Sequence, residues 1–130
     1  MAQALFFNIS GEKRKKLHFL LLKLGIAGRE IPEADFGRTL GELSGREGFS
    51  GEAEDVGETF TGEMLVMDGL NARQFNALLD GLRQARAQVA LKAVITEENL
   101  GWSAARLYRE LSAEHEAMQK YKGKKSVHGE

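Results

Sequence analysis

The sequence predicts an α/β fold in which two βαβα halves surround one small four-stranded sheet. Short apolar runs alternate along the chain with segments whose apolar residues recur every three or four positions, which is the pattern of strand–helix units. Because the apolar runs contain few polar residues, we expect helices on both faces of the sheet. The 130 residues are enough for one domain with its own core.

A second arrangement fits the same elements. In a ferredoxin-like βαββαβ order the two halves interleave, two helices cover one face of the sheet, and the last helix is an addition. The alternation of strands and helices does not separate the two arrangements. The unbroken apolar runs favour the first one.

The first half, residues 1–43, begins with an apolar strand that ends at the Ser10–Gly11 turn. A helix follows, because four leucines lie at i, i+3, i+4 and i+7, and Gly25 stands where a helix can end. A weaker strand at 27–31 is stopped by Pro32, and a short helix is expected over 34–43. The leucines of the first helix are Leu17, Leu20, Leu21 and Leu24.

Residues 44–62, which join the two halves, differ from both of them in composition. Glycines and acidic residues dominate this segment, and Arg46 is its one basic residue. We expect a mobile loop that acts as a linker or as a lid.

The second half, residues 63–120, follows the plan of the first. An apolar strand at 64–67 precedes the Asp68–Gly69 turn, and Asn71 with Gln74 predicts a helix N-cap. A fourth strand is expected at 90–95 and a last helix at 103–120, followed by a frayed basic tail at 121–130. The apolar stripe of the helix between them is Phe75, Leu78, Leu79 and Leu82.

The two halves correspond along much of their length, which predicts an internal repeat. The first strand, Gly11 and the leucines of the first helix match the strand at 64–67, Gly69 and the second apolar stripe. The matched residues are always separated by the same number of positions, which we call the offset. The segment after the second strand matches at an offset six residues larger, with Gly37 and Gly101 among the matched positions. Since any two βαβ units share a hydrophobic period, the matched glycines are the more specific part of this correspondence.

Composition and charge exclude several classes of site. The chain has no cysteine, so disulfides, thiolate metal sites and cysteine nucleophiles are absent. The 18 Lys and Arg nearly balance the 19 Asp and Glu, so the protein is not a simple polycation that binds nucleic acid by bulk charge. The N-terminus lacks the charge order of a secretory signal, and no apolar window has the length of a membrane span. We therefore expect a cytoplasmic protein without membrane contact.

The stretch Leu91-Lys92-Ala93-Val94-x-Thr96-x-x-Asn99-x-x-Trp102 places a polar pair and a tryptophan just past a strand. With the segments around it, from 63 to 118, it resembles a family of small uncharacterised bacterial proteins defined by a C-terminal domain of unknown function. The resemblance extends more loosely to the first half. It implies a bacterial, intracellular protein and brings no established activity.

Polar residues and glycines follow the strands at positions where open α/β sheets bind ligands. Free N–H groups at the start of the next helix suit an anion, whereas Asp68 would repel phosphate and suits a neutral or cationic ligand. Tight turns also need glycine without any ligand. The candidates are Ser10 and Gly11 after the first strand, and Asp68, Gly69 and Asn71 after the third.

Asn99 and Trp102 form a further candidate for ligand recognition, through an amide and an indole. A structural interpretation is favoured, in which Asn99 caps the last helix and Trp102 covers the core at its start.

The densest basic cluster occupies the first turns of the first helix, where the helix dipole disfavours positive charge. This placement indicates a partner, either a phosphate backbone or the protein's own acidic segment. Because no aromatic platform accompanies the cluster, nucleic-acid binding is the minority hypothesis. The cluster is Lys13, Arg14, Lys15 and Lys16.

No catalytic or metal-binding constellation is evident in the sequence. His115 would need a second histidine one turn later to bind zinc, and Gln119 stands there. We expect no catalytic residues, no metal and no cofactor. The sequence favours a non-enzymatic regulatory module that binds a small molecule or a protein. Nucleic-acid binding, an enzyme without a recognisable local motif, and a homodimer through a sheet edge or the last helix remain alternatives.

Overall fold

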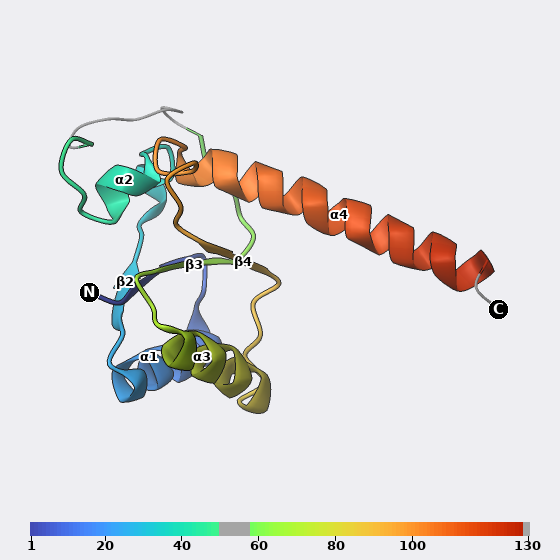
Figure 1. Cartoon of the computed structure of the whole chain (residues 1–130), viewed down its shortest axis with the longest axis horizontal. Helices are drawn as coiled ribbons and strands as arrows, with labels where there is room; N and C mark the ends of the chain where they lie inside the picture. Colours follow the sequence, from blue (N-terminus) through green and yellow to red (C-terminus); the bar gives the residue numbers. More distant parts are fainter. Residues whose placement is uncertain (50–57, 129–130) are drawn as a thin grey trace.

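A computed structural model describes residues 1–49 and 58–128, with side chains described as far as Tyr121. The chain forms one sheet between two layers of helices (Figure 1). The elements in chain order are β1 (Gln3–Phe7), α1 (Gly11–Leu24), β2 (Ala27–Glu30), the 3-10 helix η1 (Glu33–Asp35), α2 (Leu40–Leu43), β3 (Met64–Asp68), α3 (Ala72–Gln84), β4 (Leu91–Val94) and α4 (Ala104–His128).

The four strands form a mixed sheet in the order β2-β1-β3-β4. β1 is parallel to β2, β3 is parallel to β4, and the two central strands, β1 and β3, are antiparallel. Each half is therefore a complete βαβ unit, and the sheet joins the two units between β1 and β3. Because the strands of each unit are hydrogen-bonded neighbours, the chain does not adopt the interleaved ferredoxin-like order.

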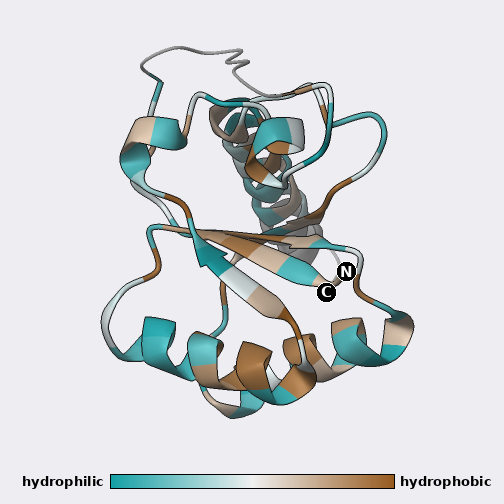
Figure 2. Ribbon diagram, turned by 90° about the vertical axis from the view of Figure 1, so that its left-hand side faces the viewer, coloured by the Kyte–Doolittle hydropathy of each residue, from teal (hydrophilic) through white to brown (hydrophobic). Residues whose placement is uncertain are grey.

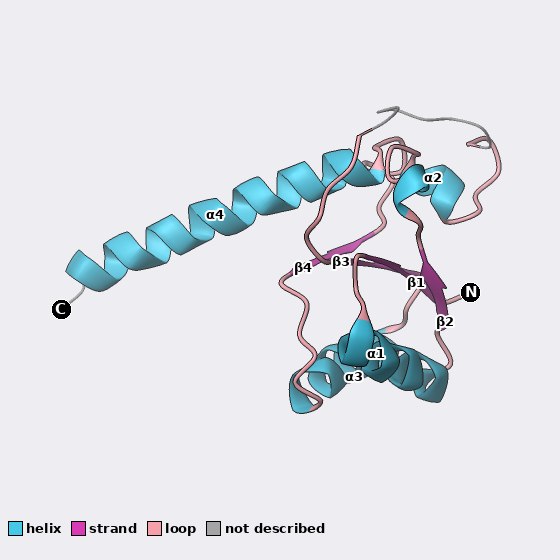
Figure 3. Cartoon of the chain, turned by 180° about the vertical axis from the view of Figure 1, so that it is seen from behind, coloured by secondary structure: helices cyan, strands magenta, loops and turns pink. Residues whose placement is uncertain are grey.

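Helices cover both faces of the sheet, as the unbroken apolar runs predict (Figures 1 and 3). α1 and α3 lie side by side on one face, over Phe6, Leu65 and Met67. On the opposite face, Phe7 and Val66 pack with α2 and the first turns of α4. The central strands are largely apolar in Figure 2, and all five residues of β3 are buried because both of its faces are covered.

The start of α3 has the predicted cap. The Asn71 side chain accepts a hydrogen bond from the Gln74 N–H at 2.8 Å, and the Gln74 side chain accepts one from the Asn71 N–H at 3.1 Å. This reciprocal pair is a capping box, so the prediction is confirmed. At the end of α1, Gly25 has the left-handed conformation (φ 74°) expected of a helix C-cap.

The helix expected over 34–43 is much shorter than predicted. In its place are the 3-10 turn η1 and the single turn α2, which begins after Thr39. The Thr39 side chain accepts the N–H of Glu42 at 3.2 Å and so starts a new helix in the middle of the predicted one. Phe36 and Leu40 nonetheless fill the core as an apolar pair.

The described ends of the acidic segment 44–62 are packed against the body. The Phe60 ring stacks between Phe36, at a centroid distance of 4.4 Å, and Tyr108, at 4.2 Å. The Asn8 amide donates to the carbonyls of Phe60 and Gly62 at 2.9 and 3.0 Å. Residues 50–57, the centre of the predicted linker or lid, lie outside the described residues.

Hydrogen bonds between the two halves are reciprocal on the α2/α4 side of the sheet. Thr39 and Ser103 form an antiparallel bridge. Two backbone N–H groups after Thr39 donate to the segment before Ser103, and the equivalent two N–H groups after Ser103 donate to the segment before Thr39. Equivalent residues of the two halves are separated by the same number of positions. This offset is the larger of the two found in the sequence. The bonds run from the N–H of Leu40 to the carbonyl of Trp102 (2.8 Å), Ala104 to Arg38 (3.1 Å), Gly41 to Leu100 (2.9 Å) and Ala105 to Phe36 (3.0 Å).

The helices α1 and α3 also correspond, but not at the offset that the leucine stripe indicates. Their N-caps are Ser10 and Asn71, which places Leu17 at the position of Leu78. The sequence pattern instead matched Leu17 with Phe75. A shift of about one helical turn preserves an apolar stripe, so periodicity alone does not set the alignment.

The last helix, α4, is the longest element. The Ser103 side chain accepts the N–H of Arg106 at 2.9 Å and starts the helix, which continues to His128 and so includes most of the predicted frayed tail. Its first turns pack on the sheet, whereas every residue from Ala113 to Tyr121 is exposed. Figures 1 and 3 show the helix projecting past β4. No helix in the described part of the chain is long and apolar enough to cross a bilayer.

Candidate partner-binding site

The two turns that the sequence marks as ligand sites lie at opposite ends of the sheet. Because β1 and β3 are antiparallel, Gln3 at the start of β1 lies opposite Asp68 at the end of β3. The Ser10–Gly11 turn follows the far end of β1. Asp68, Gly69 and Asn71 therefore do not share a site with Ser10 and Gly11, and the structure does not bring these candidates together.

The Ser10–Gly11 turn is open to solvent. Ser10 is the N-cap of α1 through its backbone, but its side chain makes no capping hydrogen bond. Gly11 has a φ of 62°, and no described atom lies within 4 Å of the position that its Cβ would occupy. Glycine is explained here by its backbone conformation, without a ligand.

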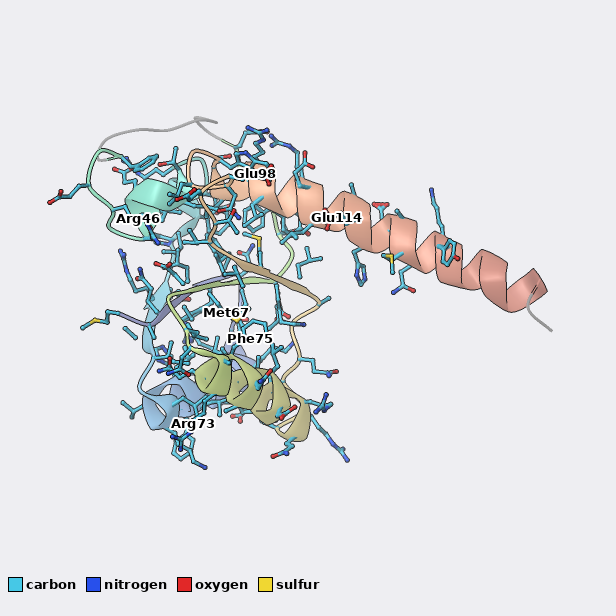
Figure 4. All side chains as sticks on the ribbon, viewed as in Figure 1. Arg46, Met67, Arg73, Phe75, Glu98 and Glu114 are labelled. Atoms are coloured by element: carbon cyan, nitrogen blue, oxygen red, sulfur yellow. The ribbon has the colours of Figure 1, made fainter. Side chains whose placement is uncertain are left out.

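Asp68 is the buried member of a partly exposed polar cluster and does not line a ligand pocket. Its carboxylate accepts two hydrogen bonds from the Arg46 guanidinium, both at 2.9 Å, and one from the Gln3 amide at 2.9 Å. Gln3 and Arg46 also bond Ser44, through its carbonyl and its hydroxyl. Figure 4 shows Arg46 on the α2 side of the molecule. The cluster ties the segment after α2 to the end of β3.

The protonation of this cluster follows from its hydrogen bonds. The Arg46 guanidinium lowers the pKa of Asp68 below its usual value, and the Gln3 amide acts in the same direction against the effect of burial. The same ion pair raises the pKa of Arg46. Asp68 is therefore an ionised structural carboxylate at neutral pH, and it is unsuited to donate a proton as a general acid.

Gly69 and Asn71 border a small hollow of about 230 Å³ between β3 and α3. Met67, Phe75 and Val94 form its apolar part, and Figure 4 shows Met67 and Phe75 near each other between the sheet and α3. The Asn71 side chain is engaged in the capping box. This hollow is smaller than the pockets that usually hold a small molecule.

Asn99 stabilises the turn between β4 and α4. Its side-chain oxygen accepts the Thr96 N–H at 2.9 Å, its amide donates to the Val94 carbonyl at 3.1 Å, and its own N–H donates to the Thr96 hydroxyl at 3.2 Å. Ser103, and not Asn99, caps α4, so the predicted cap is wrong in its residue. With its side chain buried and bonded on both polar atoms, Asn99 has a structural role.

Trp102 packs at the edge of the core beside the start of α4, as the structural interpretation predicts. The guanidinium carbon of Arg106 lies 4.3 Å from the centroid of the indole ring, in a cation–π contact. One face of the ring is thus in contact with an arginine.

The basic cluster 13–16 is largely engaged within the protein. Lys13 pairs with Glu63 at 2.7 Å, and Arg14 pairs with Glu30 at 3.2 Å. The Lys16 ammonium donates to the Ala85 carbonyl at 2.8 Å, at the C-terminus of α3. Since that terminus carries partial negative charge, it offsets the unfavourable position of the cluster at the N-terminus of α1.

Exposed apolar residues stand beside this cluster on α1. Phe19 is 71% exposed and Leu22 is 81% exposed, and both project from the side of the helix that faces away from the sheet. Sequence reasoning missed them because it followed the leucine stripe. Phe19 and Leu22 lie between the leucines of that stripe in the sequence, and this spacing places them on the opposite side of the helix.

A groove runs between α1 and α3 next to Phe19, and we call it the basic groove. Its volume is about 330 Å³, and the described residues that line it include three lysines and no acid. The helices approach closely at its floor, where a Cβ on Gly81 would lie 2.7 Å from the methyl groups of Leu20. The lining residues are Lys15, Lys16, Phe19, Leu20, Lys23, Gly81 and Ala85.

Further positive charge surrounds the basic groove on the same helical layer. Arg73 and Arg86, like Lys23 of the groove itself, form no ion pair among the residues that the structure describes, and Figure 4 shows Arg73 on the outer side of this layer. A surface with apolar residues inside a basic border binds acidic, amphipathic ligands best. Within residues 1–49 and 58–121, no three acidic or histidine side chains gather as a metal site.

Part of the chain matches a model of a known protein family. Residues 63–118 match a domain of unknown function, DUF3783. The matched stretch comprises the second βαβ unit and part of α4, so the resemblance inferred from the sequence is confirmed to that extent. No curated protein and no solved structure matches the chain.

Proposed function

We propose that the protein is a non-enzymatic module that binds an acidic, amphipathic segment of a partner protein on the outer face of α1 and α3. The observation that carries this proposal is the exposure of Phe19 (71%) and Leu22 (81%) on α1. Phe19 lines the basic groove, and Leu22 lines a neighbouring hollow of about 600 Å³. That hollow is also lined by Phe19 and Lys15, and by Arg14, His18 and Glu30. Large apolar side chains within a charged border are typical of interaction surfaces.

The second half of the chain shows that the fold does not require apolar residues at these positions. Counted from the N-caps Ser10 and Asn71, the residues of α3 that correspond to Phe19 and Leu22 are Asp80 and Arg83. These two form an exposed ion pair at 2.6 Å. The same position on an equivalent helix therefore tolerates charge, and the apolar pair on α1 calls for a functional explanation.

A protein partner explains this surface better than a small molecule does. The residues expected to bind a small ligand lie at opposite ends of the sheet, and Asp68, Asn71 and Asn99 are engaged in structural hydrogen bonds. The basic groove is open and shallow, which suits a side chain of a docked helix.

A protein partner also explains the surface better than nucleic acid does. Lys13 and Arg14 are neutralised by Glu63 and Glu30, so half of the predicted phosphate-binding cluster is committed internally. The centre of the face is apolar, whereas phosphate contacts need a continuous row of free cations.

The experiment uses a synthetic helical peptide with leucines on one side and glutamates beside them. Its binding to the full chain is followed by fluorescence anisotropy at low and high salt. The double variant Phe19→Ser, Leu22→Ser is expected to weaken binding about tenfold or more, because each exposed apolar side chain contributes about 1 kcal/mol when buried. Met118→Ser, at an exposed apolar residue on α4, is the matched control and leaves binding unchanged.

Two further probes make the experiment decisive. A peptide of the same composition in scrambled order is expected to bind at least about tenfold more weakly, since it presents no apolar side. Equal binding of both peptides contradicts the proposal. Tighter binding of single-stranded oligonucleotide than of the ordered peptide at the same salt concentration overturns it in favour of nucleic acid.

The proposal includes an internal duplication and a cellular setting. The reciprocal hydrogen bonds around Thr39 and Ser103, and the equivalent caps of α1 and α3, support two copies of one βαβ unit with an insertion between the matched parts. The absence of cysteine and the resemblance described above support a bacterial, cytoplasmic protein.

A further inference from the structure

The projecting part of α4 carries an apolar stripe that continues beyond the body of the protein. Leu107 is buried, Leu111 is partly buried against the core, and Met118 and Tyr121 are 55% and 62% exposed. With Glu114 between them, these residues alternate at spacings of four and three, which is the spacing of a helix seam. The part beyond Ser112 is about 24 Å long at 1.5 Å per residue.

The charges of this helix change sign along its length. Beyond Arg106 and Arg109, which lie in its first turns, three glutamates precede Met118 and four lysines follow it, at similar distances on either side. A second helix of the same sequence in the antiparallel direction would place lysines opposite glutamates. In the parallel direction like charges would face each other. The glutamates are Glu110, Glu114 and Glu116, and the lysines are Lys120, Lys122, Lys124 and Lys125.

We propose that a second copy of this chain covers the stripe, and that the two α4 helices pack antiparallel with Met118 at the two-fold axis. The pairing is self-complementary, because the acidic part of each α4 contacts the basic part of the other copy. It buries Met118 and Tyr121 of both copies.

The body next to the stripe leaves room for this partner. A hollow of about 210 Å³ lies where α4 passes the start of β4, lined by Leu91, Leu111 and Met118 among others. β4 is an edge strand of the sheet, and its Leu91 packs on the α4 side. The arriving helix therefore meets apolar surface on the body as well as on α4.

The expected dimer is weak. Two helices in contact over this length bury less surface than the roughly 1,200 Å² typical of stable complexes. We therefore expect dissociation at micromolar concentrations of chain, and affinity that falls as salt rises. This inference uses a different face from the proposed function and does not depend on it.

The first experiment measures the mass of the full chain by sedimentation equilibrium over a range of concentrations. The double variant Met118→Asp, Tyr121→Asp is expected to raise the dimer dissociation constant about 100-fold, because charge replaces the buried centre of the contact. Phe19→Asp with Leu22→Asp is the matched control, since it places the same two charges at exposed apolar residues of α1 and leaves the dimer intact. A monomeric wild-type chain at all concentrations, or equal loss of the dimer in both variants, overturns the proposal.

The second experiment tests direction and register. Replacing the three glutamates by lysine, or the four lysines by glutamate, is expected to give monomers at low salt, and mixing the two variants restores a dimer. Wild-type dimerisation that strengthens with salt indicates parallel helices and contradicts the proposal. Because the chain has no cysteine, Met118→Cys adds one thiol per chain and is expected to give a disulfide-linked dimer on oxidation, whereas Leu22→Cys does not.

Discussion

The ion pair between Asp68 and Arg46 is expected to stabilise the protein in a pH-dependent way. The perturbation is Asp68→Asn, which keeps the shape of the side chain and removes its charge. Asp68 accepts three hydrogen bonds, two from the Arg46 guanidinium and one from the Gln3 amide, all at 2.9 Å. The variant replaces one acceptor oxygen by an NH₂ group that faces donors, so at least one of these bonds is lost.

The magnitude follows from burial. A hydrogen bond to a charged group contributes about 1.5 to 3 kcal/mol when buried, but the Arg46 side chain is 38% exposed and regains water when the pair is broken. We therefore expect Asp68→Asn to lower the free energy of unfolding by about 2 kcal/mol at neutral pH. Arg46→Met is expected to lower it by about 1 kcal/mol, with a coupling of about 1 kcal/mol in the double-mutant cycle.

The pH dependence has a definite sign. The pKa of Asp68 is lowered in the folded state, chiefly by the Arg46 hydrogen bonds. Its contribution is therefore complete above the unfolded-state value of about 3.9 and is lost as the pH falls through the lowered folded-state value. Wild type and Asp68→Asn should differ by the full amount at pH values near neutrality and converge under strongly acidic conditions.

Urea unfolding followed by circular dichroism at neutral and acidic pH measures these differences. Glu12→Gln is a suitable control, because its ion pair with Lys15 is long, at 3.8 Å, and solvent-exposed. A loss below about 0.5 kcal/mol for Asp68→Asn, within the range of ordinary surface substitutions, would refute the reasoning. So would a difference from wild type that stays constant down to acidic pH.

Further substitutions are tested in the same assay. Leu78→Ala removes a fully buried side chain between α3 and the sheet and is expected to cost about 3 kcal/mol; a loss under about 1 kcal/mol would contradict the assigned core. Asn99→Ala breaks two side-chain hydrogen bonds in the turn before α4 and should cost about 2 kcal/mol, more than the loss of the Ser103 cap at about 1 kcal/mol. Gly69→Ala should cost about 2 kcal/mol, because φ is 73° and its Cβ would lie 2.9 Å from the Met1 carbonyl oxygen, whereas Gly101→Ala, with open space around it, should be nearly neutral.

Local chemistry was sufficient to predict several elements. The Asn71–Gln74 cap needs only the two side chains and the N–H groups that every helix start exposes, so its sequence spacing determines it. The apolar strand 64–67 has no polar alternation, and this indicates burial on both faces. The cap depends on contacts within a few residues of the chain, and the strand depends on burial alone.

The relative direction of the two halves could not be predicted in this way. Nothing local distinguishes a parallel from an antiparallel pairing of β1 with β3, yet this choice decides which turns lie together. It places the Ser10 turn and the Asp68 turn at opposite ends of the sheet. It also brings the C-terminus of α3 to Lys16, and this offsets the unfavourable position of positive charge at the start of α1.

The correspondence between α1 and α3 offers a test that separates residues that the fold requires from residues that we propose serve binding. Transferring the α3 pair to α1, as Phe19→Asp with Leu22→Arg, places on α1 the ion pair that Asp80 and Arg83 form on α3. Because both α1 positions are exposed, we expect the free energy of unfolding to change by less than about 0.5 kcal/mol, while peptide binding is lost. Unfolding of this variant would show that Phe19 and Leu22 stabilise the fold, and retained peptide binding would show that the ligand contacts another surface. Unchanged stability with lost binding is the combination that only a binding surface explains.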